Sequence, residues 1–468
     1  MKTISLLFFL VLALLQPGRS SQATDGRPLV EAYVAAFNSG EEAMRSFFEA
    51  YVSHDALAQR PIDARLAIYR QMHENFLGLS IAKVEEVTRN SITALMHTKK
   101  DEWFKFTFEL EPGPPLKMVA IRVEDAESPE SKPEPKLTEK QAITTVEQFL
   151  AEKTKKDEFS GTVLVAKNGK PLFKRAYGTA SKEFSVPNRI DTKFNLGSIN
   201  KSFTQIAVGQ LFEQGKLLLS DPVIKYLPDY PNKDAAEKIT IRQLLDMTSG
   251  VGDFFGEKFV STPKDKFRAI ADFLPMFAGD SLEFQPGTQN RYSNGGFIVL
   301  GAIIEKVSGE SYYDYVREHI FKPAGMENTE SYEADVPISN LAEGYTRESL
   351  RDHWRNNIYT RPARGSSAGG GYSTVEDLLK FTSALEKNAF FTKPETWNTL
   401  RGGEPSGSGA QKKGQEGGIG IFGGAPGINS GIETHIGRGY TAIVMSNYDP
   451  PTARDAMKKI RELLKRVR

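Results

Sequence analysis

The sequence of 468 residues contains no cysteine. This absence excludes disulfide bonds, thiolate nucleophiles and cysteine-ligated metals. Histidine is also scarce: the chain has only six, and their spacing matches no metal-ligand pattern. Covalent catalysis in this protein must therefore use an oxygen or nitrogen nucleophile. The sequence predicts neither a metal site nor a cofactor.

An excess of charge of one sign is missing as well. Lys and Arg number 60 and Asp and Glu number 59, which gives a formal net charge of +1. Such a balance provides no overall field to attract nucleic acid, so we expect no nucleic-acid partner. Hydrophobic residues make up 39% of the chain and charged residues 25%, an ordinary globular composition that excludes wholesale disorder.

Long hydrophobic runs are absent except at the N-terminus, where Lys2 precedes an apolar run over residues 4–15. About a dozen residues are too few to span a bilayer as a helix. The small residues Ser21 and Ala23 flank a plausible cleavage site, so residues 1–23 are predicted to be a secretory signal peptide. The alternative is an uncleaved membrane anchor. We expect a periplasmic or secreted protein that meets a membrane only through an uncleaved signal segment, if at all.

A proline-rich, charged stretch over residues 125–137 predicts an extended linker between two domains. Residues 24–124, before it, show apolar residues at helical spacing, followed by the strict alternation of residues 104–110 that is typical of a strand. This order of helices and then strands predicts a small α+β domain and resembles the NTF2-like family. His54 and His73 are predicted to be ordinary surface or core residues, and a binding or dimerisation module is the expected role.

Residues 138–468 predict a second, larger α+β domain. It begins with a helix over residues 138–153 and a hairpin over residues 161–176, whose tip carries Asn-Gly. The chain returns to a strand at residues 440–446 and ends in a basic amphipathic helix over residues 453–467. We therefore expect a sheet whose strands come from opposite ends of the domain.

Ser198 and Lys201 form the first candidate catalytic motif. On a helix these positions lie on one face, within reach of each other. A serine hydroxyl is a weak nucleophile that needs an adjacent base, and a desolvated lysine can provide one or can lower the pKa of a second base. The same Ser-x-x-Lys pattern recurs at residues 261–264, which carry a proline and no apolar helix behind them, so we interpret that copy as a helix start or a loop.

Tyr292 and Asn294 form the second candidate motif, in a loop that leads into an apolar helix. A phenol beside an ammonium ionises more easily and can accept the serine proton. The Asn294 amide can donate to a substrate carbonyl and can keep Lys201 oriented. A second Tyr-x-Asn at residues 230–232 lies in a proline-broken loop and is interpreted as structural.

With these motifs the second domain resembles the serine β-lactamase-like family, which includes class C β-lactamases, D,D-peptidases and related esterases. The stretches that carry the resemblance are 194–204 (FNLGSINKSFT), 219–228 (LSDPVIKYLP), 239–250 (ITIRQLLDMTSG), 284–294 (FQPGTQNRYSN), 323–329 (PAGMENT), 368–378 (AGGGYSTVEDL) and 440–450. The resemblance implies an antiparallel sheet of at least five strands flanked by helices, with a helical subdomain. It also implies Ser198 as the nucleophile, with Lys201 and Tyr292 sharing the proton transfers.

The sequence departs from this family at its third motif, where a cation, a small residue and Gly are expected. Ile421 stands at the cation position and Phe422 at the small position, while Gly423 and Gly424 remain and can complete an oxyanion hole. Lys412 and Lys413 lie nearby in the sequence and can replace the cation only if their Gly-rich loop folds inward.

Two further positions are predicted to be structural. Met247 replaces the histidine that is usual in the family, and His435 is expected to pack within a strand.

The missing cation favours substrates without a carboxylate. We therefore expect an exported serine hydrolase that forms an acyl-enzyme on Ser198 and acts on a small-molecule ester or amide. Two alternatives stay open: a β-lactamase or D,D-peptidase that acts on β-lactams or peptidoglycan peptides, and an inactive binding protein on the same scaffold.

Overall fold

The computed structural model describes residues 26–347, 352–400 and 419–468, apart from residues 60, 89, 112, 114, 127 and 130–134. The predicted signal segment and the pair Lys412 and Lys413 lie outside the described residues. The chain divides into two compact units, residues 1–132 and residues 133–468, each described here by itself. Within the described ranges, no helix has both the length and the apolar character that crossing a membrane requires.

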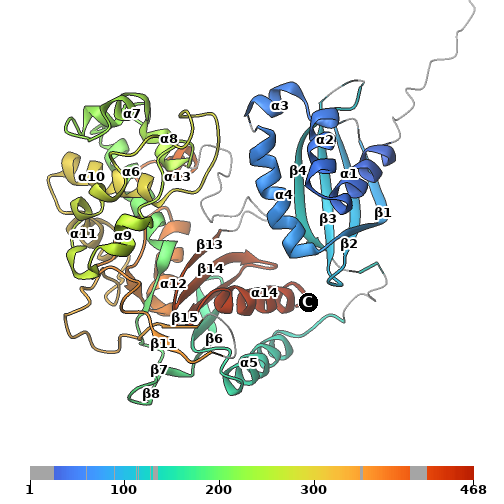
Figure 1. The fold of residues 1–468 in the computed structure, drawn as a ribbon. Helices are drawn as coiled ribbons and strands as arrows, with labels where there is room; N and C mark the ends of the chain where they lie inside the picture. Colours follow the sequence, from blue (N-terminus) through green and yellow to red (C-terminus); the bar gives the residue numbers. More distant parts are fainter. Residues whose placement is uncertain are drawn as a thin grey trace, which may run out of the picture. The chain divides into compact units, whose positions relative to one another are not determined.

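The N-terminal unit packs four helices on one face of a four-stranded sheet (Figure 1). The helices are α1 (Arg27–Ser39), α2 (Glu41–Tyr51), α3 (His54–Gln59) and α4 (Ile62–Phe76). The strands are β1 (Leu79–Val87), β2 (Ser91–Thr98), β3 (Trp103–Leu110) and β4 (Met118–Ala126), antiparallel and in chain order. Phe106 and Phe108 of β3 are fully buried, as alternation predicts. An NTF2-like family membership stays a prediction.

The predicted linker begins too early in the sequence. Asp125 and Ala126 still belong to β4, where they pair with Phe104 and Trp103 of β3. Composition alone misses this because a charged residue at a strand end is held by backbone pairing, which does not depend on an apolar side chain.

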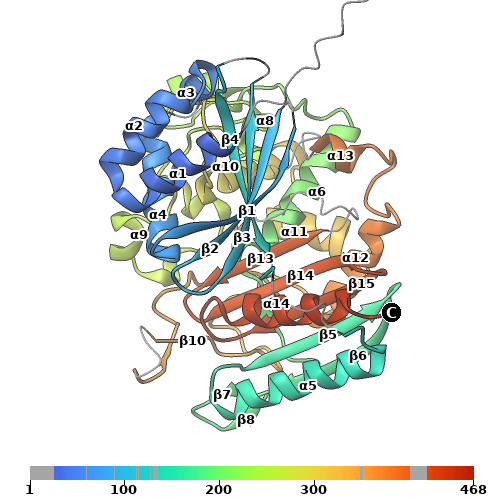
Figure 2. The same ribbon diagram turned by 90° about the vertical axis from the view of Figure 1, so that its right-hand side faces the viewer.

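The C-terminal unit is built on a five-stranded antiparallel sheet in the order β13-β14-β15-β5-β6. Its strands are β5 (Gly161–Lys167), β6 (Lys170–Tyr177), β13 (Gly420–Ala425), β14 (Ile428–Ile436) and β15 (Tyr440–Ser446). β15 pairs along its whole length with β5, so the two ends of the unit meet in the middle of the sheet (Figure 2). The predicted α+β fold with an antiparallel sheet and a helical part is confirmed.

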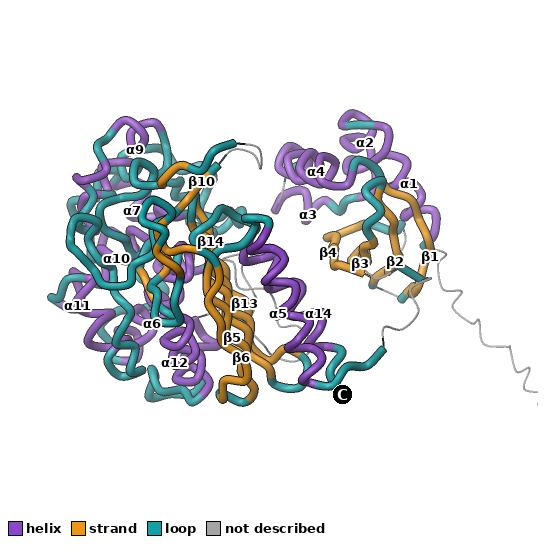
Figure 3. The backbone as a smooth tube through the Cα atoms, turned by 90° about the horizontal axis from the view of Figure 1, so that it is seen from below, coloured by secondary structure: helices purple, strands orange, loops and turns teal. Residues whose placement is uncertain are grey.

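Both faces of this sheet are covered, which gives three layers (Figure 3). α5 (Glu139–Lys155) and α14 (Thr452–Lys465) pack on one face, where Val163 and Val444 point into a core that these helices share. Leu164 and Ile443, the neighbours along each strand, point into a second core on the other face. The central strand β15 is buried on both sides and has no exposed residue, whereas most residues of the edge strand β6 are exposed.

The second core lies against the helical part of the unit. Its α-helices are α6 (Asn200–Glu213), α7 (Lys233–Lys238), α8 (Ile241–Leu245), α9 (Glu257–Ser261), α10 (Asn294–Ser308), α11 (Tyr312–Val316), α12 (Val375–Glu386) and α13 (Thr396–Leu400). Short strands also occur: β7 (Thr179–Ser181), β8 (Val186–Pro187), β9 (Phe194–Asn195), β10 (Tyr345–Thr346), β11 (Arg355–Asn356) and β12 (Tyr372–Ser373). Pairing of β9 with β12 brings the loop before β12 against the start of α6.

His435 lies in a strand, β14, as predicted, but the prediction that its side chain packs there is wrong. Its backbone has φ +54, at an irregularity in the pairing of β14 with β15, and 45% of its side chain is exposed beside Glu386. The local bulge turns this side chain out of the strand alternation, which is why the sequence pattern misplaced it.

Candidate active site

Ser198 lies in a tight turn, η1 (Gly197–Ile199), that links β9 to α6. Gly197 adopts the left-handed conformation (φ +51) that favours glycine, and a β-carbon there would come within 2.8 Å of the Gly424 backbone nitrogen. The turn therefore needs glycine for two separate reasons. It leaves Ser198 just before α6, where backbone N–H groups have no intrahelical acceptor.

Lys201 is 3% exposed, and its amine faces three oxygen atoms. Nζ lies 2.6 Å from Asn294 Oδ1, 2.6 Å from the Ala368 carbonyl oxygen and 3.3 Å from Ser198 Oγ. The first two oxygens can only accept, and a neutral amine has two hydrogens and one lone pair. With both hydrogens donated to these oxygens, the lone pair is directed to the Ser198 hydroxyl.

Burial supports the neutral form of this amine. Desolvation lowers the pKa of Lys201 to about 7, although the negative charge of Asp253 acts in the opposite direction. A substantial fraction of the amine is therefore unprotonated at neutral pH, as a base for Ser198 requires.

The Tyr292 hydroxyl lies 2.6 Å from Ser198 Oγ, and the Lys201 amine lies 4.7 Å from the centre of the Tyr292 ring. Burial raises the pKa of Tyr292 to about 12, and the hydrogen bond with Ser198 offsets only part of this effect. Because 42% of the residue is exposed, solvent moderates the shift. Even the ordinary phenol pKa of about 10 leaves Tyr292 protonated at neutral pH. The expectation that this phenol ionises easily is thus wrong, because burial and the negative charge of Asp253 both raise its pKa.

Asp253 is a member of the site that sequence analysis missed. Its Oδ2 accepts a 2.6 Å hydrogen bond from Asn294 Nδ2, and its Oδ1 accepts from the Phe255 backbone N–H at 3.1 Å. Since Nδ2 must donate to the carboxylate, Oδ1 of Asn294 is directed to Lys201. Asn294 therefore orients the amine as predicted, and one of its amide hydrogens is held by Asp253.

Strand β13 runs against the nucleophile turn. A β-carbon at Gly423 would come within 1.9 Å of the Leu196 carbonyl oxygen and 2.7 Å of the Ser198 backbone nitrogen. This close backbone approach places the Gly424 N–H beside the turn, where it and the Ser198 N–H can serve a developing oxyanion. Ile421 is 6% exposed and belongs to the core between the sheet and the helices.

A pocket of about 1110 Å³ opens over these groups, and Ser198, Tyr292 and Asn294 are among the residues that line it. Two arginines that the sequence gave no reason to select, Arg361 and Arg454, also line it. Arg361 Nη1 donates to the Tyr372 hydroxyl at 2.9 Å. The Arg454 guanidinium lies 5.1 Å from the centre of the Phe422 ring, which occupies the third motif's small position.

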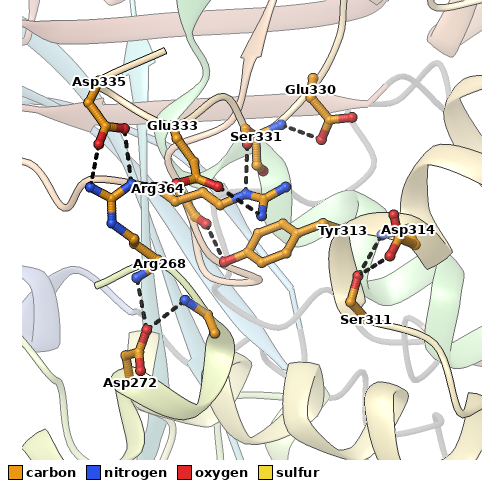
Figure 4. Close-up of polar contacts among 12 residues, drawn as sticks. Arg268, Asp272, Ser311, Tyr313, Asp314, Glu330, Ser331, Glu333, Asp335 and Arg364 are labelled. Atoms are coloured by element: carbon orange, nitrogen blue, oxygen red, sulfur yellow. Dashed lines mark hydrogen bonds and ion pairs between the residues drawn. The ribbon is translucent and has the colours of Figure 1, made fainter. Parts of the chain in front are cut away.

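Side-chain contacts of Arg364 and Tyr313 hold the loop that supplies Gly365 and Ala368 to the site (Figure 4). The Arg364 Nε donates to the Ser331 carbonyl at 2.9 Å, and its guanidinium lies 3.6 Å from the centre of the Tyr313 ring. The Tyr313 hydroxyl then donates to the Gly365 carbonyl at 2.9 Å. This support fixes the main chain from which the Ala368 carbonyl reaches Lys201.

The remaining motif positions have structural roles. Ser261 ends α9, and its hydroxyl donates to the Glu257 carbonyl at 2.8 Å, so that copy of the motif is a helix end rather than a helix start. Asn232 caps α7. Met247 is 1% exposed, and its Sδ accepts from the Ser293 N–H at 3.3 Å, which helps to position the second motif.

A serine acyl hydrolase needs a nucleophilic hydroxyl, an adjacent base and donors for the oxyanion. The Ser198 hydroxyl, the buried Lys201 amine and the neighbouring backbone N–H groups match these three requirements. A sequence profile described as "Beta-lactamase" matches residues 145–466. Penicillin-binding protein 4* of Bacillus subtilis (strain 168) is 32% identical over 270 residues, which cover 55% of this chain and 58% of that protein. The chain thus spans less than two thirds of the length of this relative.

Two solved structures extend the comparison. A penicillin-binding protein from Bacillus halodurans has 31% sequence identity and a TM-score of 0.60, over 68% of this chain and 99% of that chain. EstCE1, titled a hydrolase with promiscuous acyltransferase activity, has 20% identity and a TM-score of 0.57, over 69% of this chain and 99% of that chain. At this identity the likeness is one of fold alone. The chain belongs to the β-lactamase family of serine hydrolases.

The pKa of Lys201 should govern the pH dependence of the site. We expect the rate of Ser198 labelling by a fluorophosphonate to rise with pH through a midpoint near 7. In Asp253→Asn the side chain still accepts from Asn294, but the charge that raises the Lys201 pKa is gone, so the midpoint should move to lower pH. Asp280→Asn, which removes a surface carboxylate paired with Lys258, is the control and should leave the profile unchanged. An upward shift, or none, would contradict this role of Asp253.

Because β13 contacts the nucleophile turn, we expect alanine substitutions at the neighbouring Gly423 and Gly424 to reduce the labelling rate by very different amounts. Gly423→Ala should reduce the labelling rate by about 100-fold or more, because its methyl group meets fixed backbone and must separate the strand from the turn. Gly424→Ala meets the Pro450 side chain first and should cost less. Stopped-flow labelling measures both rates, and equal losses would refute the proposed strand contact.

Proposed function

We propose that this protein is an exported hydrolase that forms an acyl-enzyme on Ser198 and hydrolyses esters or small amides. The observation that carries the proposal is the position of the Lys201 amine, which is 3.3 Å from Ser198 Oγ while its other two neighbours are acceptors only. This arrangement prepares the amine to remove the serine proton.

The proposed reaction has two stages. Ser198 gives its proton to the Lys201 amine, and Oγ attacks the substrate carbonyl carbon. The N–H groups of Ser198 and Gly424 donate to the oxyanion that forms. The proton then passes to the leaving group through the Tyr292 hydroxyl, which is 2.6 Å from Ser198 Oγ, and the bond to the leaving group breaks. In the second stage a water molecule attacks the acyl carbon and gives up a proton to the same amine. The bond from that carbon to Ser198 Oγ then breaks, Oγ takes the proton back from the amine, and the acid is released.

The environment of the third motif supports substrates without a carboxylate. Ile421 cannot supply the cation that binds such a group, and its side chain packs in the core. An ester or a small neutral amide needs only the nucleophile, the base and the oxyanion donors, all of which belong to the geometry described above.

The proposal also includes where the protein acts and what its N-terminal unit does. The apolar run that follows Lys2 supports secretion or periplasmic delivery. For the N-terminal unit we propose a binding or dimerisation role.

A specific observation also favours a second function, the cleavage of β-lactams or of D-alanyl peptides. Arg361 and Arg454 line the pocket and can pair with a substrate carboxylate from walls other than the third motif. The family relatives named above are penicillin-binding proteins, which adds to the case for this class of substrate.

The nucleophile prediction is tested with a fluorophosphonate probe and a nitrophenyl ester. We expect the label on Ser198, and Ser198→Ala should lose the label and at least about 1000-fold of its ester turnover. Ser261→Ala, which changes the other Ser-x-x-Lys copy, is the matched control and should behave as the unaltered protein. If the unaltered protein takes no label and hydrolyses no ester, the alternative of an inactive binding protein remains. Label and turnover that survive in Ser198→Ala would show that Ser198 is not the nucleophile.

If the second function is correct, loss of the Arg454 charge should impair turnover only of substrates that carry a carboxylate. If Arg454 pairs with a carboxylate, Arg454→Gln should reduce kcat/KM for a β-lactam or a D-alanyl-D-alanine peptide by about tenfold or more, chiefly through KM. Turnover of a neutral ester should not change, and Arg454→Lys should restore part of the loss. The same modest effect on both substrate types would argue against carboxylate recognition by Arg454.

A further inference from the structure

Several large apolar side chains that line the pocket are left exposed to solvent. Phe255 is 51% exposed, Val260 is 74% exposed and Tyr359 is 84% exposed, and all three line the pocket over Ser198. Single exposed apolar residues are ordinary on a protein surface, but a group of them at the rim of a cleft marks a binding surface. We call these three residues and the buried Phe259 the apolar wall.

The apolar wall is supported from behind by a stack of phenylalanine rings. The Phe255 ring centre lies 4.1 Å from that of Phe254 and 5.2 Å from that of Phe259. These two buried rings pack in turn on Phe273 at 5.1 Å and on Phe267 at 4.9 Å. The wall is thus built on a packed core, so a ligand that covers it orders few side chains.

Lys264, which lines the pocket beside this wall, has its N–H groups engaged by the protein itself. The Lys264 amine donates to the carbonyl oxygens of Phe259 at 2.6 Å, Thr262 at 2.7 Å and Val260 at 3.2 Å. All three hydrogens of the ammonium are taken up by these oxygens, which fixes the main chain under the wall. Recognition along this side therefore depends on apolar contact and size.

From this surface, we propose that the substrate carries a large apolar group, an alkyl chain of several carbons or an aryl group, that lies on the apolar wall while its carbonyl is at Ser198. The inference rests on the proposed ester or amide hydrolysis and specifies its substrate class. A pocket of about 1110 Å³ is far larger than an acetyl group needs, and the exposed wall gains most when an apolar surface covers it.

The apolar group can belong either to the acyl part of the substrate or to its leaving group, and two ester series distinguish them. In one series the acyl chain of a nitrophenyl ester grows from acetyl to octanoyl. In the other, acetate esters carry alcohols from ethanol to octanol. We expect kcat/KM to rise by about tenfold or more along at least one series. A flat profile along both would overturn the inference.

Variants of the wall make the test specific. Phe255→Ser and Val260→Ser should each reduce the long-to-short ratio of kcat/KM at least about threefold, with turnover of the shortest ester nearly unchanged. Phe184→Ser removes a still more exposed ring (83%) that lies outside this pocket, and should leave the ratio as it is. Undiminished fluorophosphonate labelling of Ser198 shows that each variant is folded.

The two proposals fail in different ways. If Ser198 takes no label and no ester of either series is hydrolysed, the proposed function fails and the substrate class fails with it. If esters are hydrolysed through Ser198 but the chain-length ratio does not respond to the wall variants, only the apolar substrate class is wrong.

Discussion

The site depends on keeping one amine dry. Lys201 is almost completely buried and has two carbonyl oxygens for partners, one from a side chain and one from the main chain. An ion pair in the same place would hold the ammonium form, and exposure to water would restore the ordinary lysine pKa. Three elements together bury the amine and supply its partners. α6 carries the lysine, α10 begins at Asn294, and the loop that Arg364 and Tyr313 hold brings the Ala368 carbonyl.

Asp253 shows how finely this constraint is balanced. Its carboxylate orients Asn294 by a hydrogen bond and at the same time raises the pKa that burial lowers. Without Asp253 the Asn294 side chain could rotate and direct its Nδ2 at the Lys201 amine. Two hydrogen-bond donors would then face each other. The Asp253 charge leaves less of the amine unprotonated at neutral pH, but the same carboxylate orients the amide that directs the amine.

Much of this arrangement could be read from the sequence. Alternation located the strand over residues 104–110, and the Asn-Gly hairpin and a late apolar run located three strands of the second sheet. The apolar helix behind Ser198 and Lys201 selected this motif over the copy at residues 261–264, which ends a helix. What the sequence could not provide are contacts with no residue-type signal. The Ala368 carbonyl is main chain, and Asp253 reaches Asn294 across 41 positions of the chain. Arg454 stands on the last helix, α14, and only the fold brings it to the pocket. The pKa of Tyr292 likewise follows from burial, which spacing does not report.

The order of the sheet has a consequence for how the protein is made. β5 is synthesised early, yet one of its edges is paired only by β15, near the end of the chain. The oxyanion donor at Gly424 also arrives more than 200 residues after the nucleophile. A chain still emerging from the ribosome therefore carries Ser198 without a completed site. The site is complete only once the last strands have closed the sheet, and until then one edge of β5 presents unpaired backbone groups that favour association with other chains.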